Sequence, residues 1–310
     1  MSPKISIIIV NYNTSEFIEK SLNSIFLNLK NIEFEVIVVD NNSPDKSIRD
    51  FPSRFPDCSF YFLKQNRGFG AGCNYGVEKS RGEYILFLNP DVELINSDVI
   101  DLVSFMDENS DVALNSGLMT DYSGNISYCY NYFPDLSWEF SQATGFRLMK
   151  KIYTLIDYSS KAKHNFEVDW FHGAFLLVRK NIFEEINGFD ENFFLYYEDV
   201  DLQKKIKSLN YKIFCLPKVR IRHFTRGSVR SSDGQKIYTY NMHMSKLYYM
   251  NKYFNTGHIF LVRLFYLFGS FLKIAQLPFR RKYRDEFLIN LKNNMLVIKI
   301  YLTKYNITKI

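Results

Sequence analysis

Residues 4–13 read KISIIIVNYN, and a similar pattern returns at residues 34–42 (FEVIVVDNN) and 84–91 (YILFLNPD). Each stretch is an unbroken apolar run of strand length that ends in polar residues. Residues 60–63 (FYFL) add a fourth run of this kind. Such runs are typical of strands that are buried on both faces, as in a parallel sheet covered by helices.

Helical patterns lie between these runs. Thr14 begins a stretch through Leu29 whose apolar residues recur near helical spacing, and a Gly-rich segment leads into a second helix ending near Ser80. Alternating strand and helix patterns predict an α/β domain with a mostly parallel central sheet. Further strands are predicted at 112–117, 174–178 and 212–216, and further helices at 98–108, 182–186 and 198–209.

The composition, 46% hydrophobic and 23% charged over 310 residues, excludes a disordered chain and a collagen-like fibre. The four cysteines form no C-x-x-C pair, which argues against a zinc site and a disulfide framework and favours a reducing cytosol. Asn11 interrupts the first apolar run and no small-residue cleavage site follows, so this run reads as a strand and not as a signal peptide. We therefore expect an intracellular protein.

Charge divides the chain into two predicted regions, 1–235 and 236–310. The second contains 13 Lys and Arg against 2 acids, a net charge of +11, which leaves −5 for the first. Residues 258–279 are mostly apolar, but their longest charge-free piece, 264–272, is too short to span a bilayer. We expect a basic, aromatic-rich helical region that lies on an anionic membrane surface. The alternative is a helical hairpin packed on the first region. No recognised nucleic-acid-binding module surrounds the charge.

The Gly-rich segment raises the question of a dinucleotide-binding domain. Counting from Gly68, the last glycine of a G-x-G-x-x-G motif would fall on Cys73, and counting from Gly70 it would fall on Tyr75. The first strand, moreover, ends in Asn11 and not in glycines, so a pyrophosphate would find no helix N-terminus there. Both failures argue against NAD binding.

The first four predicted strands end in polar residues. In an open parallel sheet, ligands bind beyond the carboxyl ends of the strands, so these residues form one candidate edge. Asn and Asp are also common in turns, which is the alternative at any single strand end. An edge lined by Asp40, Asn66 and Asp91 can accept hydrogen bonds from a nucleobase and a ribose and hold a divalent cation against a diphosphate. The strand ends are Asn11, Asp40–Asn42, Gln65–Arg67 and Asn89–Asp91.

These motifs, in this order, resemble glycosyltransferase family 2, which has the GT-A fold, and within it the bacterial rhamnosyltransferase-type members that carry N-P-D-V where others carry D-x-D. The resemblance covers residues 4 to about 224. It rests on SIIIVNYN, VVVDNNSPD, QNRGFGAGCNYG, LFLNPDV, VDWFHGAFLLVRK, GFDENFFLYYEDVDL and Arg222-His223.

The resemblance assigns the donor site to the strand ends. Asp40 matches the residue that binds the nucleobase or ribose, and Asp91 matches the second D-x-D carboxylate, which ligates Mg²⁺ or Mn²⁺. His223 matches a histidine that some members use as a further metal ligand; a lone histidine is also often structural. Asn89 departs from the pattern, because it supplies a neutral amide where many members have a carboxylate, so metal affinity should be weaker. The predicted donor-binding residues are Asn11, Asp40, Asn66, Asn89 and Asp91, and the predicted metal ligands are Asp91 and His223.

The resemblance also locates the chemistry at residues 196–202 (YYEDVDL), where Asp199 occupies the catalytic-base position. Acids in a first helical turn can equally compensate the helix dipole, which is the reading favoured for Asp201. We expect Glu198 and Asp199 at the exposed start of that helix. Trp170 and Glu198 are the predicted acceptor-binding residues, with a core position as the alternative for Trp170.

The implied activity is inverting sugar transfer, with dTDP-L-rhamnose as the donor and a lipid-linked surface polysaccharide as the acceptor. A UDP-hexose or UDP-galactofuranose donor is the alternative, as is a non-catalytic carbohydrate-binding relative. The implied cofactor is Mg²⁺ or Mn²⁺. The implied location is cytoplasmic, peripheral on the inner face of the cell membrane; the sequence leaves the oligomeric state open.

Overall fold

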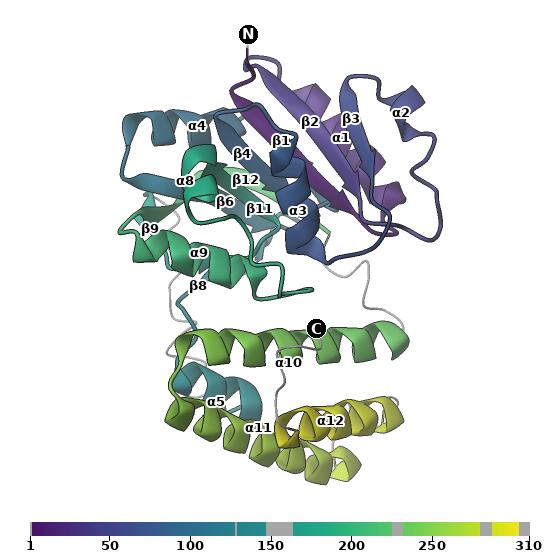
Figure 1. Ribbon diagram of the computed structural model, residues 1–310, viewed down its shortest axis with the longest axis vertical. Helices are drawn as coiled ribbons and strands as arrows, with labels where there is room; N and C mark the ends of the chain where they lie inside the picture. Colours follow the sequence, from purple (N-terminus) through teal and green to yellow (C-terminus); the bar gives the residue numbers. More distant parts are fainter. Residues whose placement is uncertain (1, 128, 147–163, 225–231, 280–286, 304–310) are drawn as a thin grey trace. The chain divides into compact units, whose positions relative to one another are not determined.

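The computed structural model describes residues 2–127, 129–146, 164–224, 232–279 and 287–303. The chain forms two compact units (Figure 1). Unit 1 comprises residues 1–132, 158–194 and 198–227. Unit 2 comprises residues 133–157, 195–197 and 228–310. Three segments within the first 235 residues, 133–157, 195–197 and 228–235, therefore belong to unit 2.

The first four long strands of unit 1 form a parallel array, as the apolar runs predict. They are β1 (Ile5–Asn11), β2 (Phe34–Asp40), β3 (Cys58–Phe62) and β4 (Tyr84–Leu88). The central strand β1 pairs in parallel with both β2 and β4, and β2 pairs in parallel with β3. Their carboxyl ends consequently meet at one edge of the sheet.

The remaining strands make the sheet mixed. In the order β3-β2-β1-β4-β11-β6-β12-β5, β11 runs antiparallel to both of its neighbours, while β12 runs parallel to β6. The bounds are β5 (Val92–Leu94), β6 (Val112–Thr120), β7 (Ile126–Ser127), β9 (Phe166–Glu167), β11 (Phe175–Arg179) and β12 (Lys212–His223), with β8 (Tyr130–Asn131) and β10 (Trp170–Phe171) in a separate pair.

Strand β12 is much longer than the 212–216 run predicts. Its pairing with β6 is irregular between Cys215 and Arg220, and regular pairing then resumes as far as Arg222. A register irregularity of this kind lets a strand pass a proline such as Pro217, which has no N–H to donate. The extension brings His223 beside β5, opposite Val92.

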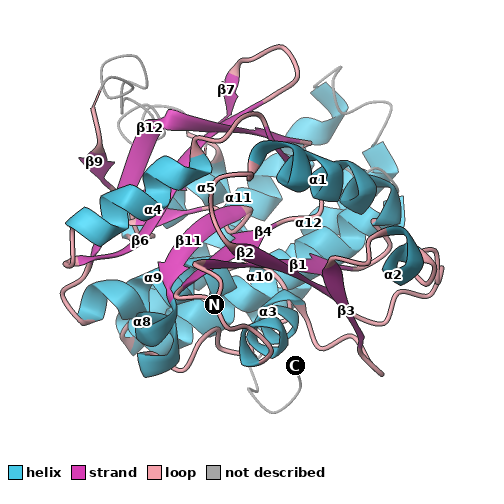
Figure 2. Cartoon of the chain, turned by 90° about the horizontal axis from the view of Figure 1, so that it is seen from above, coloured by secondary structure: helices cyan, strands magenta, loops and turns pink. Residues whose placement is uncertain are grey.

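The helices of unit 1 cover both faces of the sheet. Right-handed crossovers place α1 and α3 on opposite faces because the chain moves along the sheet in opposite directions through them (Figure 2). Gly72 and Gly76 let α3 approach the sheet closely: a Cβ at Gly76 would lie 2.5 Å from Cγ2 of Ile8. The helices are α1 (Ser15–Asn28), α2 (Phe51–Arg54), α3 (Phe69–Glu78), α4 (Val99–Glu108), α8 (Lys180–Glu185) and α9 (Glu198–Ser208).

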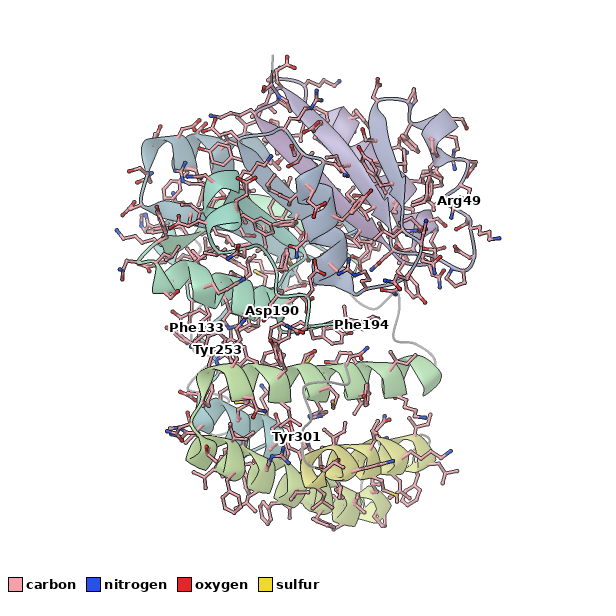
Figure 3. The ribbon with its side chains drawn as sticks, viewed as in Figure 1. Arg49, Phe133, Asp190, Phe194, Tyr253 and Tyr301 are labelled. Atoms are coloured by element: carbon pink, nitrogen blue, oxygen red, sulfur yellow. The ribbon has the colours of Figure 1, made fainter. Side chains whose placement is uncertain are left out.

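Unit 2 is helical, as predicted for the C-terminal region. Its helix α11 packs closely on α5, since a Cβ at Gly269 would lie 2.1 Å from the carbonyl oxygen of Ala143. On α12, Tyr301 (labelled in Figure 3) stacks on Tyr266 of α11 with ring centroids 4.7 Å apart. The elements are α5 (Leu136–Thr144), α10 (Ser232–Tyr253), α11 (Thr256–Gln276), the 3₁₀ turn η1 (Leu277–Phe279) and α12 (Phe287–Leu302).

Helix α11 is longer than the charge-free piece considered in the sequence. Its 21 residues are long and apolar enough to cross a membrane by length and composition, with a mean hydropathy of 1.5, and 22% of the window is buried. The expectation of a segment too short to span is thus wrong for the whole helix, which is about 31 Å long at 1.5 Å per residue. Core helices of soluble proteins pass the same test. The basic run at 280–284 lies outside the described residues.

Candidate active site

The ends of β1 and β2 form a closed hydrogen-bond network. The amide Nδ2 of Asn11 donates to Oδ1 of Asp40 at 2.7 Å and to Oγ of Ser43 at 3.0 Å. The backbone N–H of Ser43 donates to the second carboxylate oxygen of Asp40 at 3.2 Å. Asn11 and Asp40 are both buried. The structure thus brings these two predicted donor-binding residues together, and both oxygens of Asp40 already accept hydrogen bonds from the protein.

The loop that follows β3 is held in place by two asparagines. Oδ1 of Asn66 accepts the N–H of Gly68 at 2.9 Å, and Nδ2 of Asn41 donates to the carbonyl of Gly68 at 2.8 Å. Gly68 has a φ of +93°, and a Cβ there would lie 2.3 Å from the carbonyl oxygen of Phe194. Only glycine fits this position. Because Asn66 accepts the N–H of this glycine, it helps to fix the backbone at the start of α3.

A second group forms where β4 ends and β12 returns. Nε2 of His223 lies 3.4 Å from Oδ1 of Asp91, and the N–H of Phe224 donates to the backbone carbonyl of Asp91 at 3.0 Å. The backbone N–H of Asn89 donates to the carbonyl of Ala174 at 2.9 Å. The side-chain oxygen of Asn89 is buried, with no hydrogen-bond partner in the described part of the chain.

These donors fit a hard divalent cation that also binds a diphosphate. The residues available are the carboxylate of Asp91, the imidazole of His223 and the amide oxygen of Asn89, which lacks a partner. Oxygen and imidazole ligands suit Mn²⁺ and Mg²⁺. Within the described ranges, no three His, Cys, Asp or Glu side chains converge as a metal site, so the diphosphate would have to complete the coordination.

Asp199, the predicted base, lies in the first turn of α9. Its Oδ2 accepts the N–H of Gly173 at 2.8 Å, and its Oδ1 accepts the N–H of Val200 at 2.8 Å. Burial raises the pKa of Asp199 above its ordinary value, although His172 and these backbone N–H groups oppose the rise. A carboxylate with a raised pKa that keeps a fixed orientation is suited to accept a proton.

Glu198 differs from its expected position. It was expected at the exposed start of α9, but it is only 5% exposed, and its Oε2 has no hydrogen-bond partner among the described residues. Burial and the neighbouring Asp199 raise the pKa of Glu198 well above the ordinary value. The expectation of exposure is wrong because α9 turns this side chain toward α3, where Gly70 faces it. Its acceptor-binding role stays a prediction.

Trp170 is buried as well. Its indole N–H donates to the carbonyl of Tyr132 at 2.8 Å, and its ring stacks on His172 with centroids 5.1 Å apart. One face of the indole therefore contacts protein. A role as an acceptor platform stays a prediction.

His172 was not singled out in the sequence, yet it connects the two halves of the site. Burial lowers the pKa of His172, the nearby Asp199 carboxylate raises it, and His223 lowers it further. His172 is thus close enough to interact electrostatically with both Asp199 and His223. The available signal was its position two residues before the β11 run, where it shares the β4–β11 edge with Asn89.

Gln203 is a second residue that sequence reasoning missed. It is fully buried on α9, where its Oε1 accepts the N–H of Phe171 at 2.7 Å and its Nε2 donates to the carbonyl of Phe171 at 2.8 Å. This pair of hydrogen bonds fixes α9 against β10. These hydrogen bonds therefore join the helix that carries Asp199 to the segment that carries Trp170 and His172.

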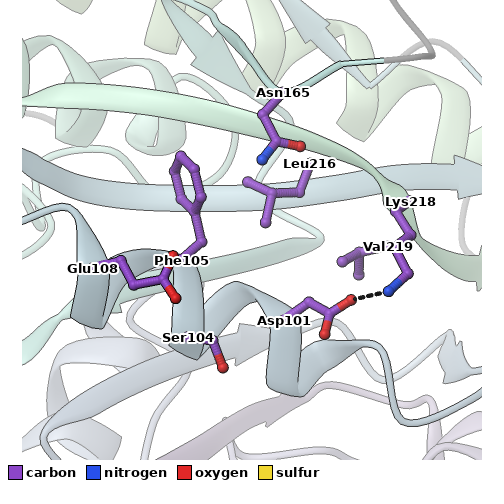
Figure 4. A pocket seen from close by; sticks show the side chains of 8 residues that line it. All are labelled: Asp101, Ser104, Phe105, Glu108, Asn165, Leu216, Lys218 and Val219. Carbon is purple, nitrogen blue, oxygen red and sulfur yellow. Dashed lines mark ion pairs between the residues drawn. The ribbon is translucent and has the colours of Figure 1, made fainter.

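Within the described part of the chain, no hydrogen bond or ion pair joins the Asn11–Asp40–Ser43 network to Asn89, Asp91 or His223. A shallow pocket of about 260 Å³ lies elsewhere in unit 1, between α4 and the irregular part of β12 (Figure 4). Lys218 pairs there with Asp101 at 2.8 Å. None of the predicted site residues lines this pocket.

Comparison with known proteins identifies the family. Residues 6–186 match the family described as Glycosyl transferase family 2, and residues 155–227 match one described as the N-terminal domain of galactosyltransferase. The chain is 29% identical over 234 residues to rhamnosyltransferase WbbL of Escherichia coli (strain K12), covering 73% of this chain and 85% of that protein.

Two further comparisons extend this result. N-acetylglucosaminyl-diphospho-decaprenol L-rhamnosyltransferase of Mycobacterium tuberculosis (strain ATCC 25618 / H37Rv) is 23% identical over 236 residues, which are 72% of this chain and 76% of that protein. The structure of mannosyltransferase PcManGT from Pyrobaculum calidifontis, in complex with GDP-Man and Mn²⁺, matches 96% of this chain and 88% of that one. Its TM-score is 0.56 at 16% identity, which supports the GT-A-like fold alone. Since the first family match spans more than half of its length, the chain belongs to glycosyltransferase family 2.

Proposed function

We propose that this chain transfers a sugar from a nucleoside diphosphate sugar to an acceptor hydroxyl, with inversion of configuration at the anomeric carbon. The observation that carries the proposal is the state of Asp199. Two backbone N–H groups orient its carboxylate, and burial raises its pKa toward the range in which a general base works. A carboxylate that served only to compensate the α9 dipole would need neither feature.

In the proposed reaction, Asp199 accepts the proton of the acceptor hydroxyl as that oxygen attacks the anomeric carbon. A single displacement of this kind inverts the configuration. Asn89, Asp91 and His223 would hold a divalent cation, which neutralises charge on the diphosphate leaving group when bound. His172 stacks on Trp170, and its charge when protonated would lower the pKa of Asp199.

The proposed donor is dTDP-L-rhamnose. Two relatives that match more than two thirds of this chain are named as rhamnosyltransferases, which supports this choice. A hexose donor, such as a UDP-hexose or UDP-galactofuranose, is the second candidate, because a further relative is named as a hexosyltransferase. A non-catalytic carbohydrate-binding role has less support, since the described site keeps its base and its Asp91–His223 pair.

The proposed acceptor is a lipid-linked glycan at the cytoplasmic face of the membrane. The acceptor in the name of the mycobacterial relative is a diphospho-decaprenol lipid. Unit 2 offers a surface suited to such a place, because one exposed stripe of α11 is apolar and the region from 236 onward carries a net charge of +11. The stripe comprises Phe260, Leu264, Phe268 and Phe271.

A donor panel tests the transferase. The protein is incubated with dTDP-L-rhamnose, UDP-glucose, UDP-galactofuranose and GDP-mannose in the presence of Mn²⁺, and nucleoside diphosphate release is measured. We expect one donor to be hydrolysed at least about 10-fold faster than the others. In Asp199→Asn, the matched control, hydrolysis of that donor should be lost while its binding is retained. Binding of glycans without hydrolysis of any donor would favour the non-catalytic alternative.

Co-sedimentation tests the membrane surface. Full-length protein is mixed with vesicles of anionic or neutral lipid over a salt series. We expect binding to anionic vesicles that weakens with salt, and a further loss in a Phe268→Asp, Phe271→Asp double variant. An Asn251→Asp, Thr256→Asp double variant adds the same charge at two exposed polar positions and serves as the control. Equal binding of the stripe variant and the control would overturn this surface.

A further inference from the structure

The three residues before the catalytic helix belong to a different unit from their neighbours. Phe194 and Glu198 are part of unit 1, whereas Leu195–Tyr197 belong to unit 2. Asp199 follows Tyr197 by only two residues. The chain therefore leaves unit 1 and returns to it immediately before the base.

The backbone of this segment is in an unusual conformation. Tyr196 has a φ of +71° and Tyr197 a φ of +67°, so two consecutive aromatic residues occupy the left-handed region. Bulky side chains rarely adopt this region, and it persists only where surrounding contacts impose it. No glycine relieves the strain at either position. Contacts with other residues must therefore stabilise the backbone conformation of Tyr196 and Tyr197.

The holding contacts come from unit 2 itself. Oγ of Ser245 on α10 donates to the carbonyl of Leu195 at 2.8 Å. The ring of Tyr196 lies edge-on to Tyr238, with centroids 5.1 Å apart, and the ring of Tyr197 contacts Tyr249 at 5.3 Å. All three contacts join the segment to α10.

A buried ion pair lies beneath these contacts. Nζ of Lys246 is 2.7 Å from Oε2 of Glu139, which also accepts the hydroxyl of Tyr266 at 2.8 Å. Lys246 follows Ser245 directly, and its Nζ lies 5.9 Å from the ring centroid of Tyr197. Glu139 and Lys246 are both buried. Their ion pair and the hydrogen bond from Tyr266 therefore hold the part of α10 that contacts the segment against α5 and α11.

We propose that Ser245 and Tyr197 are positioning residues for the catalytic base. The inference rests on the proposed function, in which Asp199 is that base. The dihedral angles at Tyr196 and Tyr197 set the direction in which α9 begins and hence the orientation of Asp199. A displacement of about 1 Å at a reacting group can lower the rate about 100-fold. The contacts of Ser245 and Tyr197 thereby act on Asp199 through the covalent chain.

Three substitutions in the full-length protein test this role. Ser245→Ala removes the hydrogen bond to Leu195, and Ser245→Thr restores a hydroxyl. Tyr197→Gly removes the ring but accepts a positive φ without strain, so the fold should be retained. Thr239→Ala is the matched control, because it removes another α10 hydroxyl whose bond stays within the helix, to the carbonyl of Gln235.

We expect kcat to fall about 10-fold or more in Ser245→Ala and Tyr197→Gly, with the donor KM unchanged, since a displaced base affects the chemical step and not donor binding. The acid limb of the pH–rate profile should also move, because a reoriented Asp199 loses backbone hydrogen bonds that lower its pKa. Ser245→Thr should recover most of the rate, and Thr239→Ala should match the wild type.

The outcomes separate two failures. If Asp199→Asn abolishes transfer while Ser245→Ala and Tyr197→Gly keep the wild-type kcat and pH profile, the positioning role is wrong and the proposed function stands. If Asp199→Asn transfers at the wild-type rate, the assignment of the base is wrong and the positioning role falls with it. A fall in kcat that follows unfolding, measured by denaturation of each variant, would also overturn the positioning role.

Discussion

The two polar groups at the carboxyl edge of the sheet differ in how completely the protein satisfies them. At the ends of β1 and β2, both oxygens of Asp40 accept hydrogen bonds from Asn11 and Ser43. At the end of β4 and the start of α9, the oxygen of Asn89 and Oε2 of Glu198 are buried without a partner among the described residues.

The difference shows how one edge can serve both stability and chemistry. Buried polar groups are nearly always hydrogen-bonded in folded proteins, so an unsatisfied one is a place where a ligand, an ion or a water molecule can supply the missing partner. Asp40 is satisfied by the protein at its end of the sheet, whereas Asn89 and Glu198 each keep one buried oxygen that the described residues do not satisfy. Substitutions in the two groups should therefore affect different measured quantities.

The largest effect is expected at Asp199. Asp199→Asn keeps the size of the side chain but removes the proton acceptor, so kcat should fall about 100-fold or more, with donor binding intact. Steady-state kinetics and calorimetry with the donor measure the two quantities. Glu184→Gln, at an exposed carboxylate of α8, is the control. An unchanged kcat would move the base elsewhere.

A smaller effect is expected at Asp91. Asp91→Ala removes the only carboxylate in the Asn89–Asp91 turn, so affinity for a nucleoside diphosphate in the presence of Mn²⁺ should fall about 10-fold or more. Asn89→Asp should change the affinity in the opposite direction because it restores an anionic ligand. Calorimetry with and without Mn²⁺ measures the nucleoside diphosphate affinity of both variants. If the wild-type protein had the same affinity in the two conditions, this would argue against a cation at the end of β4.

Asp40 should affect stability more than chemistry. In Asp40→Asn, one of the two N–H donors would face an amide nitrogen, and a hydrogen bond to a charged acceptor contributes about 1.5–3 kcal/mol. The free energy of unfolding should fall by about that amount in chemical denaturation. Asp57→Asn, at an exposed carboxylate near β3, should leave it unchanged. A weaker donor affinity with full stability would instead place Asp40 in direct contact with the donor.

The smallest effect is expected at His172. When His172 is protonated it favours the Asp199 carboxylate and lowers the pKa of that group, so His172→Gln should let that pKa rise. The base works only when ionised, and the acid limb of the kcat profile should therefore shift to higher pH while the plateau changes little. A shift to lower pH, or none, would show that His172 does not tune the base.

Much of unit 1 could be predicted from the sequence because its signals are local. Continuous apolar runs identified β1, β2 and β4, and helical spacing identified α1, since burial on two faces or on one face gives each element its own periodicity. The polar residues at the strand ends were visible for the same reason. Parallel pairing then placed them at one edge.

Only the tertiary structure decided which of these polar groups are satisfied and what holds the base. Burial of Glu198 depends on its packing toward α3, and the place of His223 depends on an irregular stretch of β12 after Pro217. Leu195–Tyr197 belong to the helical unit, where Leu195 accepts a hydrogen bond from Ser245, 50 residues away in sequence. Contacts between residues distant in the chain leave no periodic pattern, so no local reading of the sequence could show them.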